Sequence, residues 1–313
     1  MTNPSQPDVS IIIVSWNVAQ LLQDCLQSVY DTTPNLSLEV IVVDSASSDD
    51  TVQVIQSKFP QVMLMAQTDN VGFTRGNNIG LAVAHGRHVF LLNPDTIILG
   101  DTIDQMVAYL DENPTVGIVG PHTLNTDMTH QSTRRRFPTI GTAFFESTWL
   151  EGIAPRHILD RYYVRDMADD VLGAVDWVQG SALMARHEVY DQIGGLDEGY
   201  VMFWEELDWC KRAKLAGWGV TYLGTSKMVH HGGKSTDQAG ARKHIHFQES
   251  KLRYYKKFHG AGFALLLRIF LLLNYTWQIM VEGIKALLGS KRTMRRERIT
   301  VYWQVLRSGL KVS

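Results

Sequence analysis

The first 120 residues alternate between short runs of β-branched apolar residues and segments whose apolar residues recur at helical spacing. This pattern predicts strands at 9–15, 39–43, 62–65, 88–92 and 116–120, with helices at 21–29, from 49 onward, at 73–84 and at 101–112. Such alternation favours an α/β fold with a mostly parallel sheet and helices on both faces. Ligands of these sheets bind beyond the carboxyl ends of the strands. We therefore expect a site at that edge.

Two acidic residues directly follow predicted strands. Asp44 comes directly after the strand at 39–43 and precedes a serine-rich turn. Asp95 is the last residue of an Asn-Pro-Asp segment that follows the strand at 88–92. By itself, an aspartate in a turn is most often a helix cap. A carboxylate at a strand end is also a hard oxygen ligand, which Mg²⁺ or Mn²⁺ commonly combines with substrate phosphates.

A third group of acids begins a predicted helix, in the segment Trp-Glu-Glu-Leu-Asp-Trp-Cys at 204–210. Acids in a first helical turn ordinarily interact favourably with the helix dipole. The neighbouring tryptophans and Phe203 give these acids an apolar setting, which raises a carboxyl pKa toward the range of a general base.

Two histidines, His230 and His231, follow a short predicted strand at 220–223 and begin a glycine-rich segment that continues through Lys234 and Ser235. A lone histidine is usually structural. Two histidines in such a loop can contact a cation and a diphosphate. The four segments therefore supply what transfer from an activated diphosphate donor needs: an acid for the nucleoside, a carboxylate for a cation, a base, and an imidazole.

In this order the segments resemble the family 2 glycosyltransferases, the inverting enzymes of the GT-A fold, over roughly residues 9–235. The resemblance implies a Rossmann-like GT-A domain, a divalent cation (Mg²⁺ or Mn²⁺) and in-line displacement with inversion. It includes an Asn-x-Gly-Phe…Asn-x-Gly segment within 69–80. The donor-binding residues that it implies are Ser15, Asn17, Asp44, Ser47, Asn70, Gly72, Asn78, Asn93 and Asp95.

The same resemblance assigns the catalytic, metal and acceptor roles. Glu206 is the general base by position; it replaces the commoner aspartate, so Glu205 or Asp208 could share the role. Asp95 and His230 are the metal candidates. Asn93 stands where the family usually has an acid, so it would contact the nucleotide or a metal-bound water, and a metal-independent variant is the alternative. The acceptor-binding candidates are Trp177, Gly180, Asp197 and Arg135. Arg135 belongs to a run of three arginines, which is either a solvated loop or a phosphate contact.

The C-terminal segment differs in kind. Residues 262–280 are strongly apolar and basic clusters flank them. About 20 such residues suffice to span a bilayer. However, the polar residues share roughly one third of the helix circumference, which favours a helix in the membrane interface: Arg268, Asn274, Gln278, Glu282 and Lys285. The alternative is a helical hairpin packed on the catalytic domain or on a second subunit.

We therefore predict a catalytic domain at 1–258, with a nucleotide-binding half at 9–120 and an acceptor half at 121–258. A helical tail at 259–313 would bind the cytoplasmic membrane surface or mediate a homodimer. Residues 1–8 are polar and contain no signal core, so the chain is expected on the cytoplasmic side, peripheral on the inner face of the cell membrane. The 30 basic and 32 acidic residues give a net charge of −2 and no basic field that would favour nucleic acid.

Within the family the chain looks most like bacterial rhamnosyltransferases of polysaccharide assembly, which implies a dTDP-rhamnose donor and a glycan or lipid-linked acceptor. A UDP-hexose or another nucleotide sugar is the alternative donor. A nucleotidyltransferase is disfavoured, because Ser-Trp-Asn-Val at 15–18 occupies the place of its glycine-rich basic loop. A non-catalytic sugar-nucleotide-binding module is also considered, although all four chemical groups are present.

Overall fold

The computed structural model describes residues 6–232, 241–289 and 291–311. These residues form two compact units. The first contains 6–137, 163–198 and 205–232, and the second contains 138–162, 199–204, 241–289 and 291–311. Gly233, Lys234 and Ser235, the end of the predicted histidine segment, lie outside the described residues. The domain bounds at 1–258 and 259–313 stay a prediction.

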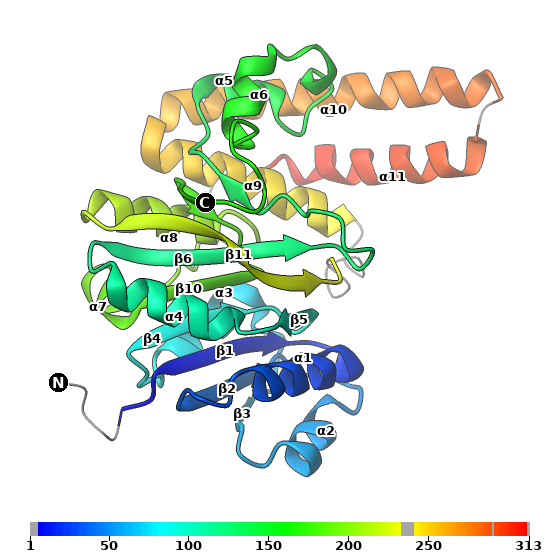
Figure 1. Cartoon of the computed structure of the whole chain (residues 1–313). Coiled ribbons are helices and arrows are strands. Elements are labelled where there is room, and N and C mark those ends of the chain that lie inside the picture. Colours follow the sequence, from blue (N-terminus) through cyan, green and yellow to red (C-terminus); the bar gives the residue numbers. More distant parts are fainter. Residues whose placement is uncertain (1–5, 233–240, 290, 312–313) are drawn as a thin grey trace. The chain divides into compact units, whose positions relative to one another are not determined.

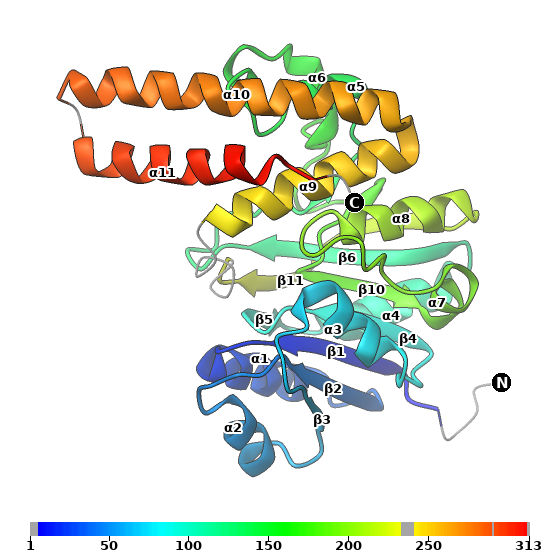
Figure 2. The ribbon, with the colours of Figure 1, turned by 180° about the vertical axis from the view of Figure 1, so that it is seen from behind.

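The first unit is an α/β structure in which every strand and helix predicted before residue 121 is present. Its sheet has the strand order β3-β2-β1-β4-β10-β6-β11-β5, and β8 pairs with β11. In the described chain six of these strands run in one direction, and β10, β5 and β8 run opposite. Helices α1 and α4 cover one face (Figure 1), and α3 covers the other (Figure 2). The predicted mostly parallel, helix-flanked sheet is therefore confirmed.

The bounds of the elements in the first unit are as follows. The strands are β1 (Val9–Ser15), β2 (Leu38–Asp44), β3 (Met63–Ala66), β4 (His88–Leu92), β5 (Thr96–Leu99), β6 (Val116–Leu124), β7 (Arg134–Arg135), β8 (Leu172–Ala174), β9 (Trp177–Val178), β10 (Ala182–Arg186) and β11 (Gly219–His230). The helices are α1 (Ala19–Thr32), α2 (Thr51–Lys58), α3 (Gly72–Leu81), α4 (Thr102–Glu112), α7 (His187–Ile193) and α8 (Glu205–Leu215).

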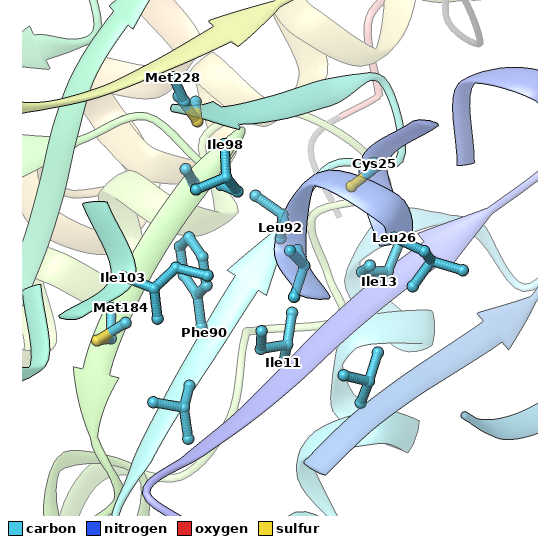
Figure 3. Packing of buried hydrophobic residues seen from close by; sticks show 14 of the residues in the cluster. Ile11, Ile13, Cys25, Leu26, Phe90, Leu92, Ile98, Ile103, Met184 and Met228 are labelled. Atoms are coloured by element: carbon cyan, nitrogen blue, oxygen red, sulfur yellow. The ribbon is translucent and has the colours of Figure 1, made fainter. Parts of the chain in front are cut away.

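The core explains why these segments adopt these structures. Ile11 and Ile13 of β1 lie between Leu26 of α1 and Phe90 of β4, and all four side chains are buried (Figure 3). β-Branched side chains suit a strand that is covered on both faces. On the other face α3 packs closely on β1, because a Cβ atom at Gly76 would lie 2.7 Å from Cγ1 of Val14. The glycines of this helix therefore allow the close approach.

Two strands differ from the prediction. β5 was not predicted: it is only four residues long, and it is held as an antiparallel partner of β11. β11 was predicted at 220–223 but extends to His230, since its second half pairs with β5 and with the end of β6. This extension carries His230 to the edge where Asp44 and Asp95 lie.

The second unit is helical. It contains α5 (Ile140–Phe145), a 3₁₀ turn η1 (Glu151–Ile153), α6 (Arg156–Tyr162), α9 (Ala241–His259), α10 (Ala261–Leu287) and α11 (Arg292–Ser308). Helices α10 and α11 lie side by side as an antiparallel hairpin (Figures 1 and 2). Among the described residues α10 alone is long and apolar enough to cross a membrane, by length and composition.

Candidate active site

Side-chain hydrogen bonds join the turns that follow β1 and β2. The backbone N–H of Asn17 donates to Oγ of Ser47 (2.9 Å), and the N–H of Ser48 donates to Oδ1 of Asn17 (2.7 Å). Asn17 and Ala46 have left-handed backbone conformations, with φ of 53° and 57°. Ser15 is paired with Asp44 in the β1–β2 register. Ser15, Asn17, Asp44 and Ser47 therefore lie together at the carboxyl edge of the sheet. Their role in donor binding stays a prediction.

The carboxylate of Asp44 has one oxygen committed to the turn and one available. Oδ2 accepts a hydrogen bond from the N–H of Ser47 (3.0 Å). Oδ1 is buried and has no hydrogen-bond partner among the described residues, and the same holds for Oγ of Ser15. A buried acceptor without a donor is costly unless a ligand supplies one. Asp44 can thus accept a hydrogen bond from an N–H group of a bound base.

The glycine- and asparagine-rich segment divides into two parts. Oδ1 of Asn70 accepts from the N–H of Gly72 (2.9 Å), whose φ of 73° begins α3. Asn78 lies further along α3, where its amide group binds the backbone N–H and C=O of Leu196 (2.8 and 2.9 Å) and Oε1 of Glu198 (3.0 Å). The side chain of Asn78 therefore holds the loop at 194–198, and its predicted contact with the donor is not favoured by this geometry.

The Asn-Pro-Asp segment meets the end of β11. Nε2 of His230 lies 3.2 Å from Oδ1 of Asp95 and 3.4 Å from Nδ2 of Asn93. On the other side of the ring, Nδ1 of His230 lies 2.7 Å from Oε1 of Gln131. An amide oxygen can only accept, so Nδ1 carries a proton and Nε2 is the ring nitrogen that faces Asp95. An outer hydrogen bond of this kind orients a metal-binding imidazole.

The ligating atoms at this position fit a divalent cation whose remaining ligands come from the substrate and from water. Within residues 6–232, 241–289 and 291–311 no three histidine, cysteine or acidic side chains are grouped as a full metal site. One carboxylate, Asp95, and one imidazole nitrogen, Nε2 of His230, are adjacent. Mg²⁺ and Mn²⁺ accept few protein ligands when phosphate oxygens and waters supply the rest.

Glu205 and Glu206 are the first two residues of α8 and both are buried. The backbone enters this helix through two left-handed residues, Phe203 (φ 68°) and Trp204 (φ 71°). Bulky residues rarely adopt this conformation, and such strain is concentrated at functional sites. The N–H of Gly180 donates to Oε1 of Glu206 (3.4 Å), while Oε2 has no partner in the described part of the chain.

The environment of the two glutamates raises both pKa values. Burial is the main cause for each; for Glu205 the negative charge of Glu206 adds to it. Hydrogen bonds from the backbone of Gly180 and the positive charge of Arg135 act in the opposite direction on the pKa of Glu206. A carboxylate with a raised pKa is a stronger base than an exposed one, so this pair has the character of a general base.

The predicted acceptor residues Arg135, Trp177 and Gly180 lie beside this base. The ribbon β7–β9 pairs Arg135 with Trp177. The guanidinium of Arg135 lies over the ring of Tyr163, 4.7 Å from its centroid, and 6.0 Å from that of Trp177. A Cβ atom at Gly180 would lie 3.5 Å from Cβ of Glu206. Arg135, Tyr163 and Trp177 thus form an aromatic and cationic surface next to the carboxylate of Glu206.

Asp208 lies in the same helical turn but has another partner. Nε of Arg212 donates to Oδ2 of Asp208 (2.8 Å), and the rest of the guanidinium binds the carbonyl oxygens of Ile193 and Gly195 (both 2.7 Å). The pair thus anchors the loop that carries Asp197. A catalytic role of Asp208 stays a prediction that this geometry does not favour, and the acceptor role of Asp197 stays a prediction as well.

Gln131 is a residue of the site that the sequence did not reveal. Its Nε2 donates to Oδ1 of Asn125 (2.9 Å), which turns Oε1 toward His230. Ser181 is a second: its buried Oγ has no hydrogen-bond partner among the described residues, and its carbonyl accepts from the N–H of Asn93 (2.9 Å). Gln131 sits in a polar loop without any motif, whereas Ser181 could have been found as the neighbour of Gly180.

A cavity of about 640 Å³ lies at the opposite edge of the sheet, at the start of β4 and the end of β10. Its charged groups already bind one another. Arg87 pairs with Asp8 (2.8 Å) and Asp111 (2.9 Å), and His88 lies 3.0 Å from Asp111. The acids for transfer chemistry are at the other edge, so we place the site there.

The model of the family described as "Glycosyl transferase family 2" matches residues 10–174, more than half of the chain. The chain is 25% identical over 239 residues to the N-acetylglucosaminyl-diphospho-decaprenol L-rhamnosyltransferase of Mycobacterium tuberculosis (strain CDC 1551 / Oshkosh), covering 72% of this chain and 76% of that protein. It is 26% identical over 197 residues to rhamnosyltransferase WbbL of Escherichia coli (strain K12), covering 58% and 69%.

Among solved structures, the mannosyltransferase PcManGT from Pyrobaculum calidifontis in complex with GDP-Man and Mn²⁺ is similar, with a TM-score of 0.57 and 18% identity. The superposition covers 98% of this chain and 86% of that one. This likeness concerns the fold, and it confirms the predicted GT-A architecture. With the family match over residues 10–174, the conclusion is direct: this protein is a glycosyltransferase that belongs to glycosyl transferase family 2.

Proposed function

We propose that this protein is an inverting glycosyltransferase that moves rhamnose from dTDP-rhamnose onto a hydroxyl group of a glycan or lipid-linked glycan. The observation that carries the proposal is the convergence of three groups in the first unit. They are the available Oδ1 of Asp44, the Asp95–His230 pair, and the buried Glu206 beside Gly180. A nucleoside, a diphosphate and an acceptor hydroxyl need these three functions.

In the proposed reaction Glu206 is the general base. The N–H of Gly180 holds Oε1, which leaves Oε2 to take the proton of the acceptor hydroxyl. The acceptor oxygen forms a bond to the anomeric carbon as the bond from that carbon to the diphosphate oxygen breaks. The proton ends on Glu206 and the electron pair on the diphosphate. Burial keeps water from competing for the carboxylate.

Asp95 and His230 would hold a divalent cation, and Gln131 would fix the imidazole tautomer that can bind it. When bound, the cation supplies positive charge next to the leaving diphosphate. Support comes from the imidazole Nε2 of His230 lying next to the Asp95 carboxylate, and from the Mn²⁺ named with the structurally similar mannosyltransferase.

The names of the relatives support the sugar and the acceptor. The mycobacterial relative is named as an L-rhamnosyltransferase whose acceptor carries a diphospho-decaprenol group. Arg135 lies beside Glu206 and is stacked on Tyr163, which suits a phosphate-bearing acceptor, because a planar guanidinium can bind phosphate with two hydrogen bonds. We further propose that the enzyme acts at the cytoplasmic surface of the cell membrane.

The test is a panel of donors titrated by calorimetry with Mn²⁺ or Mg²⁺ present: dTDP-rhamnose, UDP-glucose, UDP-galactose and GDP-mannose. We expect dTDP-rhamnose to bind most tightly, and Asp95→Ala to weaken that binding. Preference for another donor would replace the rhamnosyl assignment and keep the transferase. Binding of none of the four by folded protein would favour a non-catalytic module.

A further inference from the structure

Helix α10 has its polar residues on the inside. At roughly 100° per residue, Arg268, Asn274, Gln278 and Glu282 share one side of the helix. That side faces other parts of the second unit: Asn274 and Glu282 are buried, and Oδ1 of Asn274 accepts from the backbone N–H of Trp149 (3.2 Å). This polar row therefore binds protein, an orientation that the sequence pattern did not predict.

The contacts of the polar row join α10 to α11. Nη1 of Arg295 lies 2.6 Å from Oε2 of Glu282, and Nη1 of Arg298 lies 3.6 Å from Oε1. Nε of Arg268 donates to the carbonyl oxygen of Gly309 (2.8 Å). Tyr275 and Tyr302 add an aromatic contact, with ring centroids 5.5 Å apart. The hairpin is thus held together by paired charges rather than by an apolar seam alone.

The opposite side of α10 is an exposed row of large apolar side chains. Its members are between 46% and 82% exposed: Leu265, Leu266, Ile269, Leu273, Trp277, Met280, Ile284 and Leu287. We call them the apolar row. The surface continues onto Trp149, which follows α5 in the chain and is 47% exposed. The centroid of its ring lies 5.9 Å from that of Trp277. A contiguous apolar surface of this length marks an interaction site.

The charge of the hairpin indicates what covers the apolar row. Residues 261–313 contain nine arginines and lysines and two glutamates, a net charge of +7, in a chain whose total is −2. Helical spacing puts Arg292, Arg296 and Arg307 on one side of α11 together with the exposed Trp303. Arginines with exposed indole rings beside an apolar surface suit the headgroup region of an anionic bilayer. A second positively charged copy would be repelled at long range.

The geometry also decides between lying on a membrane and crossing it. Because α11 runs back along α10, a spanning α10 would carry α11 into the hydrocarbon as well. Five arginines of α11 would then enter the bilayer, each at a cost of several kcal/mol. A helix with one apolar face and its charges directed away from that face can instead lie in the plane of the interface.

We propose that the α10–α11 hairpin docks in the plane of an anionic lipid bilayer, with the apolar row among the acyl chains and the arginines of α11 at the headgroups. This inference deepens the membrane location in the proposed function. It predicts that lipid binding depends on the apolar row and on Arg292, Arg296 and Arg307, and that it is independent of the donor site.

The test is co-sedimentation of the full chain with phosphatidylcholine vesicles, with and without phosphatidylglycerol. We expect binding to the mixed vesicles, a loss of roughly tenfold or more for Leu266→Glu with Leu273→Glu, and a loss of about fivefold for each of Arg292→Gln and Arg296→Gln. Leu215→Glu is the matched control: Leu215 is 70% exposed on α8 of the first unit and should change nothing.

Circular dichroism and donor titration on the same samples show that the variants are folded, and they separate this proposal from the proposed function. Equal vesicle binding by wild type and the double variant would overturn it. So would an absence of binding combined with a dimer in analytical ultracentrifugation that Leu273→Glu dissociates, since a second copy would then cover the row. Resistance of the bound protein to extraction by alkaline carbonate would overturn the in-plane geometry in favour of a spanning helix.

Discussion

The sheet edge of the first unit and the α10–α11 hairpin of the second differ in whether their buried carboxylates have partners and in where their apolar residues lie. At the sheet edge, apolar residues form the core and buried carboxylates keep oxygens without a hydrogen-bond partner in the described chain, as in Asp44 and Glu206. In the hairpin the buried carboxylate of Glu282 has two arginine partners, and the apolar residues are outside. Buried acceptors that lack donors suit ligand chemistry, whereas buried charges with partners suit structure.

This comparison predicts which substitutions affect activity and which affect stability. Removing a carboxylate from the sheet edge should reduce transfer with little loss of fold. Removing one from the hairpin should loosen the fold with little effect on donor binding.

Among the variants that compare the two regions, the largest effect is expected for Asp95→Asn. The substitution removes the carboxylate next to Nε2 of His230, and several kcal/mol of charge stabilisation at the diphosphate would be lost. We expect transfer to fall on the order of a hundredfold or more, and donor affinity to become insensitive to added Mn²⁺ and to chelator. Asp31→Asn, on the exposed side of α1, is the control. Unchanged cation dependence in Asp95→Asn would remove Asp95 from the metal site.

A pair of glycine substitutions tests the packing of the sheet. A Cβ atom at Gly80 would overlap Cγ2 of Ile12, so Gly80→Ala should lower the free energy of unfolding by about 1–3 kcal/mol. Gly283 in α10 has no atom within 4 Å of such a Cβ. Gly283→Ala should therefore leave stability unchanged or raise it by up to about 1 kcal/mol. Urea unfolding measures both; equal effects would contradict the close contact of α3 with β1.

Glu282→Gln tests the paired charges of the hairpin. It leaves Arg295 and Arg298 without their carboxylate, and we expect a loss of about 1–2 kcal/mol in the stability of α10 and α11. Hydrogen exchange should report faster opening of these helices, with the donor affinity of the first unit unchanged. Glu297→Gln, on the exposed side of α11, should have no such effect. If both variants behave alike, the ion pairs are not what holds the hairpin.

The smallest effect is a pH dependence of stability that Glu205 contributes. Burial, with the charge of Glu206, raises the pKa of Glu205 well above 4.5, so the folded state keeps a proton that the unfolded state has released. Stability from this group is therefore lost as the pH rises through its folded-state pKa. Glu205→Gln should be more stable than wild type near pH 8 and similar to it near pH 4. The opposite order in thermal unfolding would mean that Glu205 is ionised and stabilised.

The sequence predicted the sheet edge well and the hairpin surface poorly, for a physical reason. Periodicity reports which residues are buried in a strand or helix, and strand ends follow from it, so Asp44 and Asp95 could be placed at one edge. Glu206 and Gly180 are far apart in the sequence, but the family resemblance assigned both of them to the site. Gln131 had no motif, and its role depends on the path of a loop.

For α10, the periodicity predicts which residues share each face of the helix, but not what each face contacts. A polar row and an apolar row are equally consistent with a helix that turns either face to its neighbours. Only the partners at Glu282 and Asn274 decide that the polar row is inside. The hydrogen bonds of Asn78 to the loop at 194–198 were hidden for the same reason, because hydrogen bonds over such distances leave no local pattern.

The most direct test of the proposed active site separates donor binding from transfer in Glu206→Gln. Donor affinity is measured by calorimetry, and turnover by release of nucleoside diphosphate with an acceptor that supports the wild type; Glu205→Gln is the matched variant. We predict unchanged affinity and a fall in turnover of about 10²–10⁴-fold for Glu206→Gln, with wild-type turnover decreasing as the pH falls through the raised pKa of Glu206. Retained turnover in Glu206→Gln, with loss in Glu205→Gln, would contradict the assignment of the base.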